Sequence, residues 1–222
     1  MLNPPPTYQP PPDTGLEILY LDESLLICNK PAGLLSVPGR GEAHQDCLLH
    51  RLQQRHPEAL LVHRLDMETS GLLVFARTTG AQRTLSMAFA ARQVEKRYIA
   101  VVSGLLTPDH GSVALPLITD WPNRPRQKVD HEIGKPSLTE YQVLARDEAG
   151  QCTRVALRPV TGRSHQLRVH MLALGHPILG DRLYGAPPPP GKASRLLLHA
   201  EWLALPHPQT GARIECCSQA TF

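Results

Sequence analysis

Short apolar runs separated by turn-forming residues repeat along most of this chain. The first stretch, LEILYLDESLLICNKPAG at residues 16–33, has two such runs on either side of Asp22-Glu23-Ser24. Apolar runs of this length bounded by turn residues predict β-strands. The same pattern predicts one strand in residues 71–77 and one in 94–104, and a strand pair in 137–162 and in 195–218.

Three segments instead space their apolar residues at helical intervals. They are DCLLHRLQQRHP at residues 46–57, TTGAQRTLSMAFAARQ at 78–93 and RSHQLRVHMLALG at 163–175. Asp46 is a suitable N-cap for the first helix, because its side-chain oxygen can accept the free N–H groups of the first turn. Gly175 follows the last apolar residue of the third helix and suits a helix C-terminus.

The order of these elements defines the expected fold class. Strands are gathered in hairpins with a few helices between them, and no regular β-α-β alternation or internal repeat is present. This pattern predicts an α+β fold with a mixed, mostly antiparallel sheet flanked by helices and loops. No linker-like stretch interrupts residues 16–222, which are therefore expected to form a single domain. Residues 115–129, LPLITDWPNRPRQKV, contain three prolines and are expected to be a loop.

Two Pro-rich segments lie outside this pattern. Residues 1–15, MLNPPPTYQPPPDTG, are expected to form an extended, flexible leader, and residues 186–194, APPPPGKAS, a second loop. The leader lacks the basic start and apolar core of a signal peptide. No apolar run approaches the ~20 residues that span a bilayer. We therefore expect a cytoplasmic protein without a membrane segment.

Composition narrows the function classes. The chain has 222 residues, 41% of them hydrophobic, which is enough for a sizeable core. A net charge of +3 is only a weak pointer to a polyanionic partner, so local clusters of charge must decide. The 5 cysteines include no C-x-x-C pair, and the 11 histidines are scattered without metal-ligand spacing. We expect free thiols in a reducing compartment and no metal site.

One acidic residue has an unusual setting. Asp66 lies in LVHRLDMETSGLLVFA, residues 61–76, after the basic pair His63-Arg64 and before Thr69-Ser70-Gly71. One interpretation makes it a turn or cap residue. The other makes it a carboxylate at the edge of the core, which stays ionised beside a cation and acts as a nucleophile or a base. The pattern of residues alone leaves both open.

The cation could come from the third predicted helix. The segment TGRSHQLRVH gathers Arg163, His165, Arg168 and His170, and Arg168 follows the packing residue Leu167 directly. This is either a solvated helix face or a cationic edge that clamps a carboxylate and contacts phosphates.

Three further features have two interpretations each. Tyr98, in a predicted strand, is either a packing residue or a ring on which a nucleobase stacks. Lys30, before a proline, is either an exposed turn residue or a substrate contact. The basic residues Arg124, Arg126 and Lys128 are a solvated loop unless they join the other basic segments on one face.

Together these segments resemble the RluA-type family of pseudouridine synthases. Residues 63–71 match its signature H-R-L-D-x-x-T-S-G at every fixed position. Four further matches follow in the family's order: NKPAGLLSVPG, KRYIAVV, GRSHQLRVHM and RLLLHA. The resemblance covers residues 16–222, and the Pro-rich segments depart from it without touching the motifs. Many relatives carry an N-terminal S4 RNA-binding domain, which is not expected here because only 15 residues precede the first predicted strand.

The resemblance implies an isomerase. The implied reaction converts specific uridines to pseudouridine in 23S rRNA and in tRNA anticodon stem-loops, by base flipping and without cofactor or metal. It also implies residue roles: Asp66 as catalytic carboxylate, Arg168 as its ion-pair partner, Tyr98 stacking on the uracil, Arg64 filling the space of the flipped nucleotide, Leu198 forming an apolar wall, and Lys30 among the substrate-binding residues. We expect RNA as partner and a monomer.

Several alternatives remain at this point. A non-catalytic RNA-binding protein could share the scaffold, and a nucleoside glycosidase would also use a carboxylate. A glycosidase normally needs two acids, and only Glu68, at a variable position of the motif, lies near Asp66 in sequence. Whether Asp66 attacks the sugar, adds to the base or removes a sugar proton is left open.

Overall fold

The computed structural model describes residues 8–185 and 193–222. The expectations for residues 1–7 and for most of the second Pro-rich loop, 186–192, lie outside the described residues.

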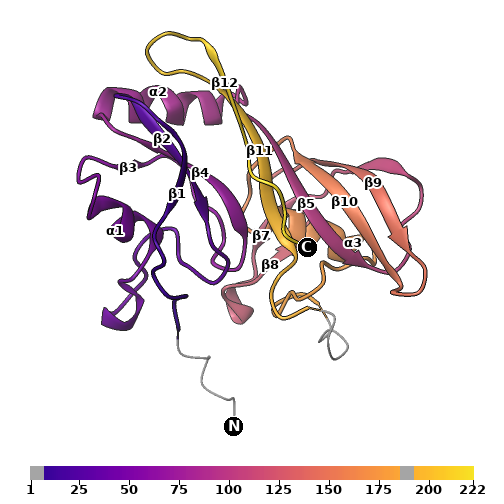
Figure 1. Ribbon diagram of the computed structural model, residues 1–222. Helices are drawn as coiled ribbons and strands as arrows, with labels where there is room; N and C mark the ends of the chain where they lie inside the picture. The colour runs from indigo at the N-terminus through magenta and orange to yellow at the C-terminus, as the bar shows by residue number, and fades with distance from the viewer. Residues whose placement is uncertain (1–7, 186–192) are drawn as a thin grey trace.

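One mixed sheet runs through the described chain, in the order β1-β2-β4-β11-β5-β10-β9-β6, with β12 beside β11 and β3 beside β4. Figure 1 shows β11 between the N-terminal strands and the half formed by β5, β10 and β9. Its strands are β1 (Glu17–Leu21), β2 (Leu25–Lys30), β3 (Leu60–Leu61), β4 (Ser70–Ala76), β5 (Glu95–Ser103), β6 (His110–Val113), β9 (Thr139–Asp147), β10 (Cys152–Pro159), β11 (Leu198–Pro206) and β12 (Arg213–Cys217). Among these strands only β4 and β11 pair in parallel. The predicted class and the predicted strands are confirmed, while β3 and β6 were not predicted.

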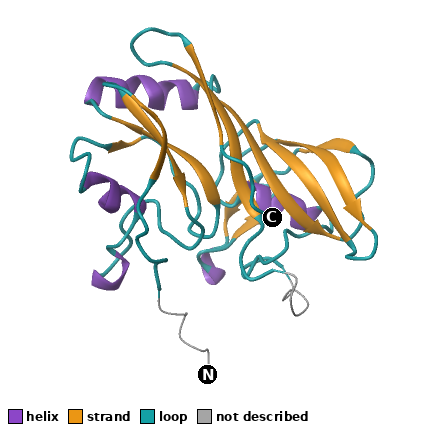
Figure 2. Cartoon of the chain, in the orientation of Figure 1, coloured by secondary structure: helices purple, strands orange, loops and turns teal. Residues whose placement is uncertain are grey.

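The helices lie against the sheet, as Figure 2 shows. They are α1 (Leu48–Gln53), α2 (Thr79–Ala90) and α3 (Gln166–Ala173), with short 3-10 turns at η1 (Glu42–His44) and η2 (Trp121–Asn123). All three α-helices were predicted from apolar spacing. Within the described residues, none is long and apolar enough to cross a bilayer.

Strand β4 explains why one run of the sequence is continuously apolar. Its seven residues are all buried, because both faces of the strand are covered. Leu72 and Val74 pack in the cluster that includes Leu85 of α2, whereas Leu73 and Phe75 pack with Leu48 of α1. Alternate residues of a strand point to opposite faces, so a strand covered on both sides needs apolar residues throughout.

The third helix covers the other half of the sheet. Leu167 and Met171 of α3 pack in a cluster with Leu157 of β10. Tyr98 of β5 contacts this cluster and also the one beneath α1. The tyrosine therefore lies where the two halves of the molecule meet.

Gly71 is required by the parallel pairing of β4 and β11. It pairs with Ala200 and has φ of 113°, in the region that favours glycine. A Cβ atom at this position would overlap the Ala200 backbone. The glycine of the T-S-G motif thus allows β4 to approach β11 directly behind the Asp66 loop.

Two local expectations need correction. Residues 115–129 are not simply a loop, because β7 (Leu117–Thr119) and β8 (Gln127–Val129) pair within them as a two-stranded sheet. The N-cap of α1 is Cys47, whose sulfur accepts from the His50 amide. Asp46 instead binds Arg51 through both carboxylate oxygens, at 2.8 and 2.7 Å.

The described part of the predicted leader is held against the domain. Tyr8 is 9% exposed, and its hydroxyl donates to the Asp46 carbonyl and accepts from the Leu35 amide. Arg51 donates to the Pro11 carbonyl at 2.6 Å. Residues 8–15 lack regular secondary structure, as expected, and these contacts join this part of the leader to the domain.

Candidate active site

A pocket of about 290 Å³ lies beside Tyr98 and is formed by segments far apart in the sequence. Five of the six predicted site residues line it: Arg64, Asp66, Tyr98, Arg168 and Leu198. The sixth, Lys30, is not among the lining residues.

Asp66 lies in the loop between β3 and β4. Its backbone carbonyl accepts the Thr69 amide at 3.1 Å, so the turn interpretation describes its main chain correctly. Its side chain is 21% exposed and lines the pocket. The residue therefore closes a turn with its backbone and presents its carboxylate to the pocket.

The backbone on both sides of Asp66 is fixed by the segment that follows β2. The Ser36 hydroxyl donates to the Leu65 carbonyl at 2.7 Å and accepts the Leu65 amide at 3.2 Å. The Gly33 amide donates to the Met67 carbonyl at 2.9 Å. The motif NKPAGLLSVPG thus holds the residues immediately before and after the carboxylate.

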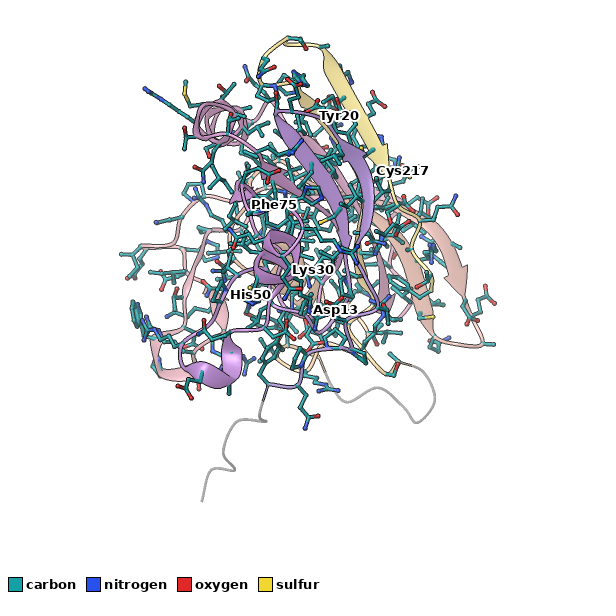
Figure 3. All side chains as sticks on the ribbon, turned by 60° about the vertical axis from the view of Figure 1, so that its left-hand side comes forward. Asp13, Tyr20, Lys30, His50, Phe75 and Cys217 are labelled. Carbon is teal, nitrogen blue, oxygen red and sulfur yellow. The ribbon has the colours of Figure 1, made fainter. Side chains whose placement is uncertain are left out.

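Lys30 belongs to this support and has no surface for a substrate. Its side chain is 0% exposed, and its ammonium donates to the carbonyls of Pro31, Leu34 and Met67 at 2.8, 2.7 and 2.9 Å. Figure 3 labels it in the body of the N-terminal half. Burial lowers the pKa of this amine to about 7, and Asp66 is the largest influence in the opposite direction. Lys30 therefore supports the Asp66 loop, and the predicted contact between Lys30 and the substrate is corrected.

Arg168 is 3% exposed and holds two carboxylates at once. Its Nε and Nη2 donate to Asp181 at 2.7 and 2.8 Å, and its Nη1 donates to Asp66 Oδ2 at 3.2 Å. Asp181 also accepts the amides of Leu183 and Tyr184, and its side chain is 1% exposed. The predicted contact between Arg168 and Asp66 is present, but Asp181 is the stronger partner that orients the guanidinium.

A histidine also approaches the carboxylate. His165 Nε2 lies 3.8 Å from Asp66 Oδ2, and His165 Nδ1 lies 2.6 Å from the hydroxyl of Tyr184. The rings of His165 and Tyr184 meet edge to face. His165 stands in the cationic segment TGRSHQLRVH, but no pattern in the sequence links it to Asp66.

The wall of the pocket combines a phenol with an apolar side chain. Tyr98 is partly buried, and burial, followed by the charge of Asp66, raises the pKa of its hydroxyl well above the ordinary value. The ring is therefore neutral at physiological pH. Leu198 is 3% exposed and lines the same pocket.

The two basic residues before Asp66 have different surroundings. Arg64 is exposed at the edge of the pocket. His63 stacks on Phe89 with ring centroids 4.5 Å apart, and its Nε2 accepts the Val74 amide. Burial lowers the pKa of His63 to about 3, with a smaller contribution from Lys96. His63 is consequently a neutral packing residue that fixes the loop to β4.

Asp181 and Tyr184 are the residues that sequence reasoning missed. Both lie in the segment GDRLYG after α3. In the sequence this segment is typical of a turn, and neither its Asp nor its Tyr stands in a distinctive pattern. The link between Asp181 and Arg168 spans 13 residues and depends on how the chain folds back after Gly175. No local pattern of apolar residues encodes that return. Within the described residues, no group of three His, Cys, Asp or Glu side chains could hold a metal ion.

The fold and the site together define a class of protein: a single catalytic domain in which a carboxylate, oriented by a buried arginine, faces a pocket with an aromatic ring. Residues 24–173 match the family described as RNA pseudouridylate synthase. The chain therefore belongs to the RNA pseudouridylate synthase family, whose members are isomerases acting on uridine in RNA. This membership confirms the predicted family and the predicted enzyme class. The two alternative functions, a nucleoside glycosidase and a non-catalytic RNA-binding protein, are therefore set aside.

Two relatives are similar over almost their whole lengths. The protein of Escherichia coli strain K12 named dual-specificity RNA pseudouridine synthase RluA is 54% identical over 215 residues, which cover 97% of this chain and 98% of that protein. The protein of the same name from Salmonella typhimurium is 56% identical over 204 residues, 92% of this chain and 93% of that protein.

Two solved human structures share the fold. Human RNA pseudouridylate synthase domain containing 1 aligns with a TM-score of 0.79 and 31% identity, covering 95% of this chain and 86% of that one. Human RNA pseudouridylate synthase domain containing 4 aligns with a TM-score of 0.71 and 26% identity, covering 92% and 88%.

Proposed function

We propose that this protein isomerises specific uridines to pseudouridine in both large-subunit rRNA and tRNA anticodon stem-loops. The observation that supports this proposal is the identity of 54% and 56% to relatives named dual-specificity, over nearly the full length of both chains. The proposed substrates are the large-subunit rRNA and tRNA sites that share a local sequence.

The reaction imposes clear requirements on the site. The bond between uridine N1 and C1′ breaks, a bond between C5 and C1′ forms, C5 loses a proton and N1 gains one. Oxidation state does not change, so no electron carrier is required. The site must supply an ionised carboxylate, a proton route and a wall that keeps the detached uracil in place.

We assign the first requirement to Asp66. Arg168 donates to Oδ2 of its carboxylate and lies in a buried clamp with Asp181, which fixes the direction of the Asp66 carboxylate. The geometry is compatible with attack on the sugar, addition to the base or removal of a sugar proton.

Residues in the walls and at the rim of the pocket are suited to flip the uridine and to keep the detached uracil in place. The neutral ring of Tyr98 and the side chain of Leu198 offer an aromatic and an apolar surface to a uracil. Arg64, exposed at the rim, is placed to enter the space that the flipped nucleotide leaves in the RNA. Base flipping delivers the uridine to a pocket that a stacked base does not reach.

We also propose that the protein acts as a monomer in the cytoplasm, where rRNA and tRNA are its substrates. The described chain places all the assigned residues in one copy. Light scattering coupled to size-exclusion chromatography measures the mass directly, and a dimer as the active species would refute this part.

The substrates are tested by mapping pseudouridine in rRNA and tRNA from cells with and without the gene. We expect one or more large-subunit rRNA sites and anticodon stem-loop sites to lose pseudouridine together in the deletion strain. Complementation with the wild-type gene should restore both classes. Loss in only one class of RNA would refute dual specificity while leaving the enzyme class intact.

A further inference from the structure

His165 has an unusual backbone and two polar neighbours. It immediately precedes α3 and has φ of 54°, in the left-handed region that few residues other than glycine adopt. Its side chain is only 12% exposed and lines the pocket. Strained conformations of this kind persist where the surroundings fix them, and they are common at functional sites.

The hydrogen-bond partners determine which ring nitrogen bears the proton. The Tyr184 hydroxyl accepts the backbone amide of Gln127 at 2.6 Å and lies 2.6 Å from His165 Nδ1. The amide can only donate, which leaves the hydroxyl's own hydrogen available to be donated to Nδ1. Nδ1 of a neutral ring is then the acceptor, and the ring proton resides on Nε2. This nitrogen is the one that faces Asp66.

Burial keeps the ring of His165 neutral at physiological pH. Burial lowers the pKa of His165, and the positive charges of Arg168 and Arg64 act in the same direction. The negative charges of Asp66 and Asp181 act against it but do not prevail. A neutral ring can hold the single tautomer that the Tyr184 hydroxyl selects.

Two donors converge on one oxygen of Asp66. Arg168 Nη1 lies 3.2 Å from Oδ2, and His165 Nε2 lies 3.8 Å from the same atom. A shift of less than 1 Å would bring the histidine contact within hydrogen-bonding distance. Both contacts are made to Oδ2, so the other oxygen, Oδ1, takes part in neither of them.

We propose that His165 is a positioning residue for Asp66: its Nε2–H, set by Tyr184, joins Arg168 in holding Oδ2 and leaves Oδ1 as the oxygen that meets the substrate. The inference rests on the proposed role of Asp66 as the catalytic carboxylate. If His165 contacted an RNA phosphate at the start of α3 instead, its substitution would affect RNA affinity and not turnover. Gln127 begins β8, so the ring's orientation depends on the β7–β8 hairpin.

Two substitutions separate this role from backbone strain. Asn tolerates the left-handed conformation better than most residues, but its short amide cannot extend to Asp66. Gln suits that backbone less well and can place an amide N–H near the position of Nε2. We expect His165→Asn to lower kcat about 10- to 100-fold, as a misplaced group does, with little change in RNA Kd. His165→Gln should retain most of the wild-type kcat.

A spectroscopic measurement tests the tautomer independently of activity. In ¹⁵N NMR spectra, His165, assigned by comparison with His165→Gln, should have a bare Nδ1 and a protonated Nε2. Tyr184→Phe removes the hydroxyl and should abolish this preference and lower kcat. This measurement keeps the proposal testable if His165→Asn does not fold.

The outcomes are distinct. A protonated Nδ1 in the wild-type protein, full turnover in a folded His165→Asn, or equal losses in the Asn and Gln variants would each overturn the proposal. A fall in RNA affinity without a fall in kcat would identify a phosphate contact instead. Asp66→Asn is assayed in parallel: if it is inactive while His165→Asn turns over normally, the role of Asp66 stands and that of His165 fails.

Discussion

Arg168 is bound more tightly by Asp181 than by Asp66. Two hydrogen bonds of 2.7 and 2.8 Å join its guanidinium to Asp181, whereas one of 3.2 Å joins it to Asp66. Asp181 is almost fully buried, while the Asp66 side chain retains 21% exposure. The buried carboxylate therefore fixes the arginine, and the arginine in turn orients a carboxylate that still faces the pocket.

Asp181→Asn should weaken both the fold and the reaction. It leaves the buried guanidinium of Arg168 without its bidentate partner, and breaking a buried ion pair in this way costs about 3–5 kcal/mol. We expect a loss of that order in the free energy of unfolding, measured by urea denaturation, and a lower kcat because Arg168 is no longer fixed.

Asp46→Asn is the matched control. Asp46 holds Arg51 with the same two-bond geometry, but it lies away from the pocket and its side chain is 40% exposed. Solvent screening limits such pairs to about 1 kcal/mol. Wild-type kcat is expected for Asp46→Asn, and an equal loss of kcat in both variants would mean that Asp181 has no specific link to the site.

Lys30→Met tests the support of the Asp66 loop. The substitution removes the ammonium that holds the Met67 carbonyl and leaves buried carbonyls without a donor, at a cost of about 1–3 kcal/mol for each group left unsatisfied. We expect lower stability and lower kcat with unchanged RNA affinity. Filter-binding and turnover assays on the same preparation separate these effects, and a selective loss of RNA affinity would restore the substrate-contact interpretation.

The same variant should alter the dependence of stability on pH. Burial lowers the pKa of Lys30 to about 7 in the folded protein, below the value of ~10.4 in an unfolded chain. Between these values the unfolded state binds more protons, so this amine makes the free energy of unfolding rise with pH. The stability difference between wild type and Lys30→Met should therefore increase from pH 7 to 10. A difference that is constant or falls would contradict the lowered pKa.

Tyr98 should act through its ring. Its hydroxyl has a raised pKa because of burial and the nearby Asp66, so it does not ionise in the range where the enzyme works. Tyr98→Phe keeps the stacking surface and should retain measurable turnover, whereas Tyr98→Ala should lose it. The dependence of wild-type kcat on pH should show no change below pH 10 that is caused by ionisation of Tyr98. Equal activity of the Phe and Ala variants would rule out stacking.

Arg64→Ala should slow base flipping without weakening general RNA binding. Unstacking a base costs a few kcal/mol, and each 1.4 kcal/mol corresponds to about tenfold in rate, so we expect kcat to fall about tenfold or more. A fluorescent 2-aminopurine beside the target uridine reports the flipped state. Arg83→Ala removes an exposed arginine on α2 and should leave the signal unchanged. Normal flipping in Arg64→Ala would exclude this role.

The fold was largely predictable because its elements have local signals. Runs such as LLIC and GLLVFA are apolar and lie between turn-forming segments, and they form most of β2 and β4. The hairpin of β7 and β8 was missed because Pro122 and Pro125 suggest a loop, although both prolines lie between the strands where no ladder hydrogen bond is needed.

The site was predictable only in part. Asp66, Arg168 and Tyr98 stand in motifs, and the structure brings them to one pocket. The partners that hold them depend on long-range contacts: Asp181 reaches Arg168 after a chain reversal, and Lys30 reaches Met67 across 37 residues. Such contacts leave no periodic signal, so a buried ammonium could not be distinguished in the sequence from an exposed turn lysine.

The central claim is that Asp66 is the catalytic carboxylate, and one measurement tests it most directly. Formation of the C5–C1′ bond expels the hydrogen at C5, so RNA containing [5-³H]uridine releases tritium on turnover. Asp66→Asn is compared with Glu68→Gln, which neutralises the other acid of the same loop. We predict no tritium release by a folded, RNA-binding Asp66→Asn and near wild-type release by Glu68→Gln. Release by Asp66→Asn at a rate similar to that of Glu68→Gln would contradict the account.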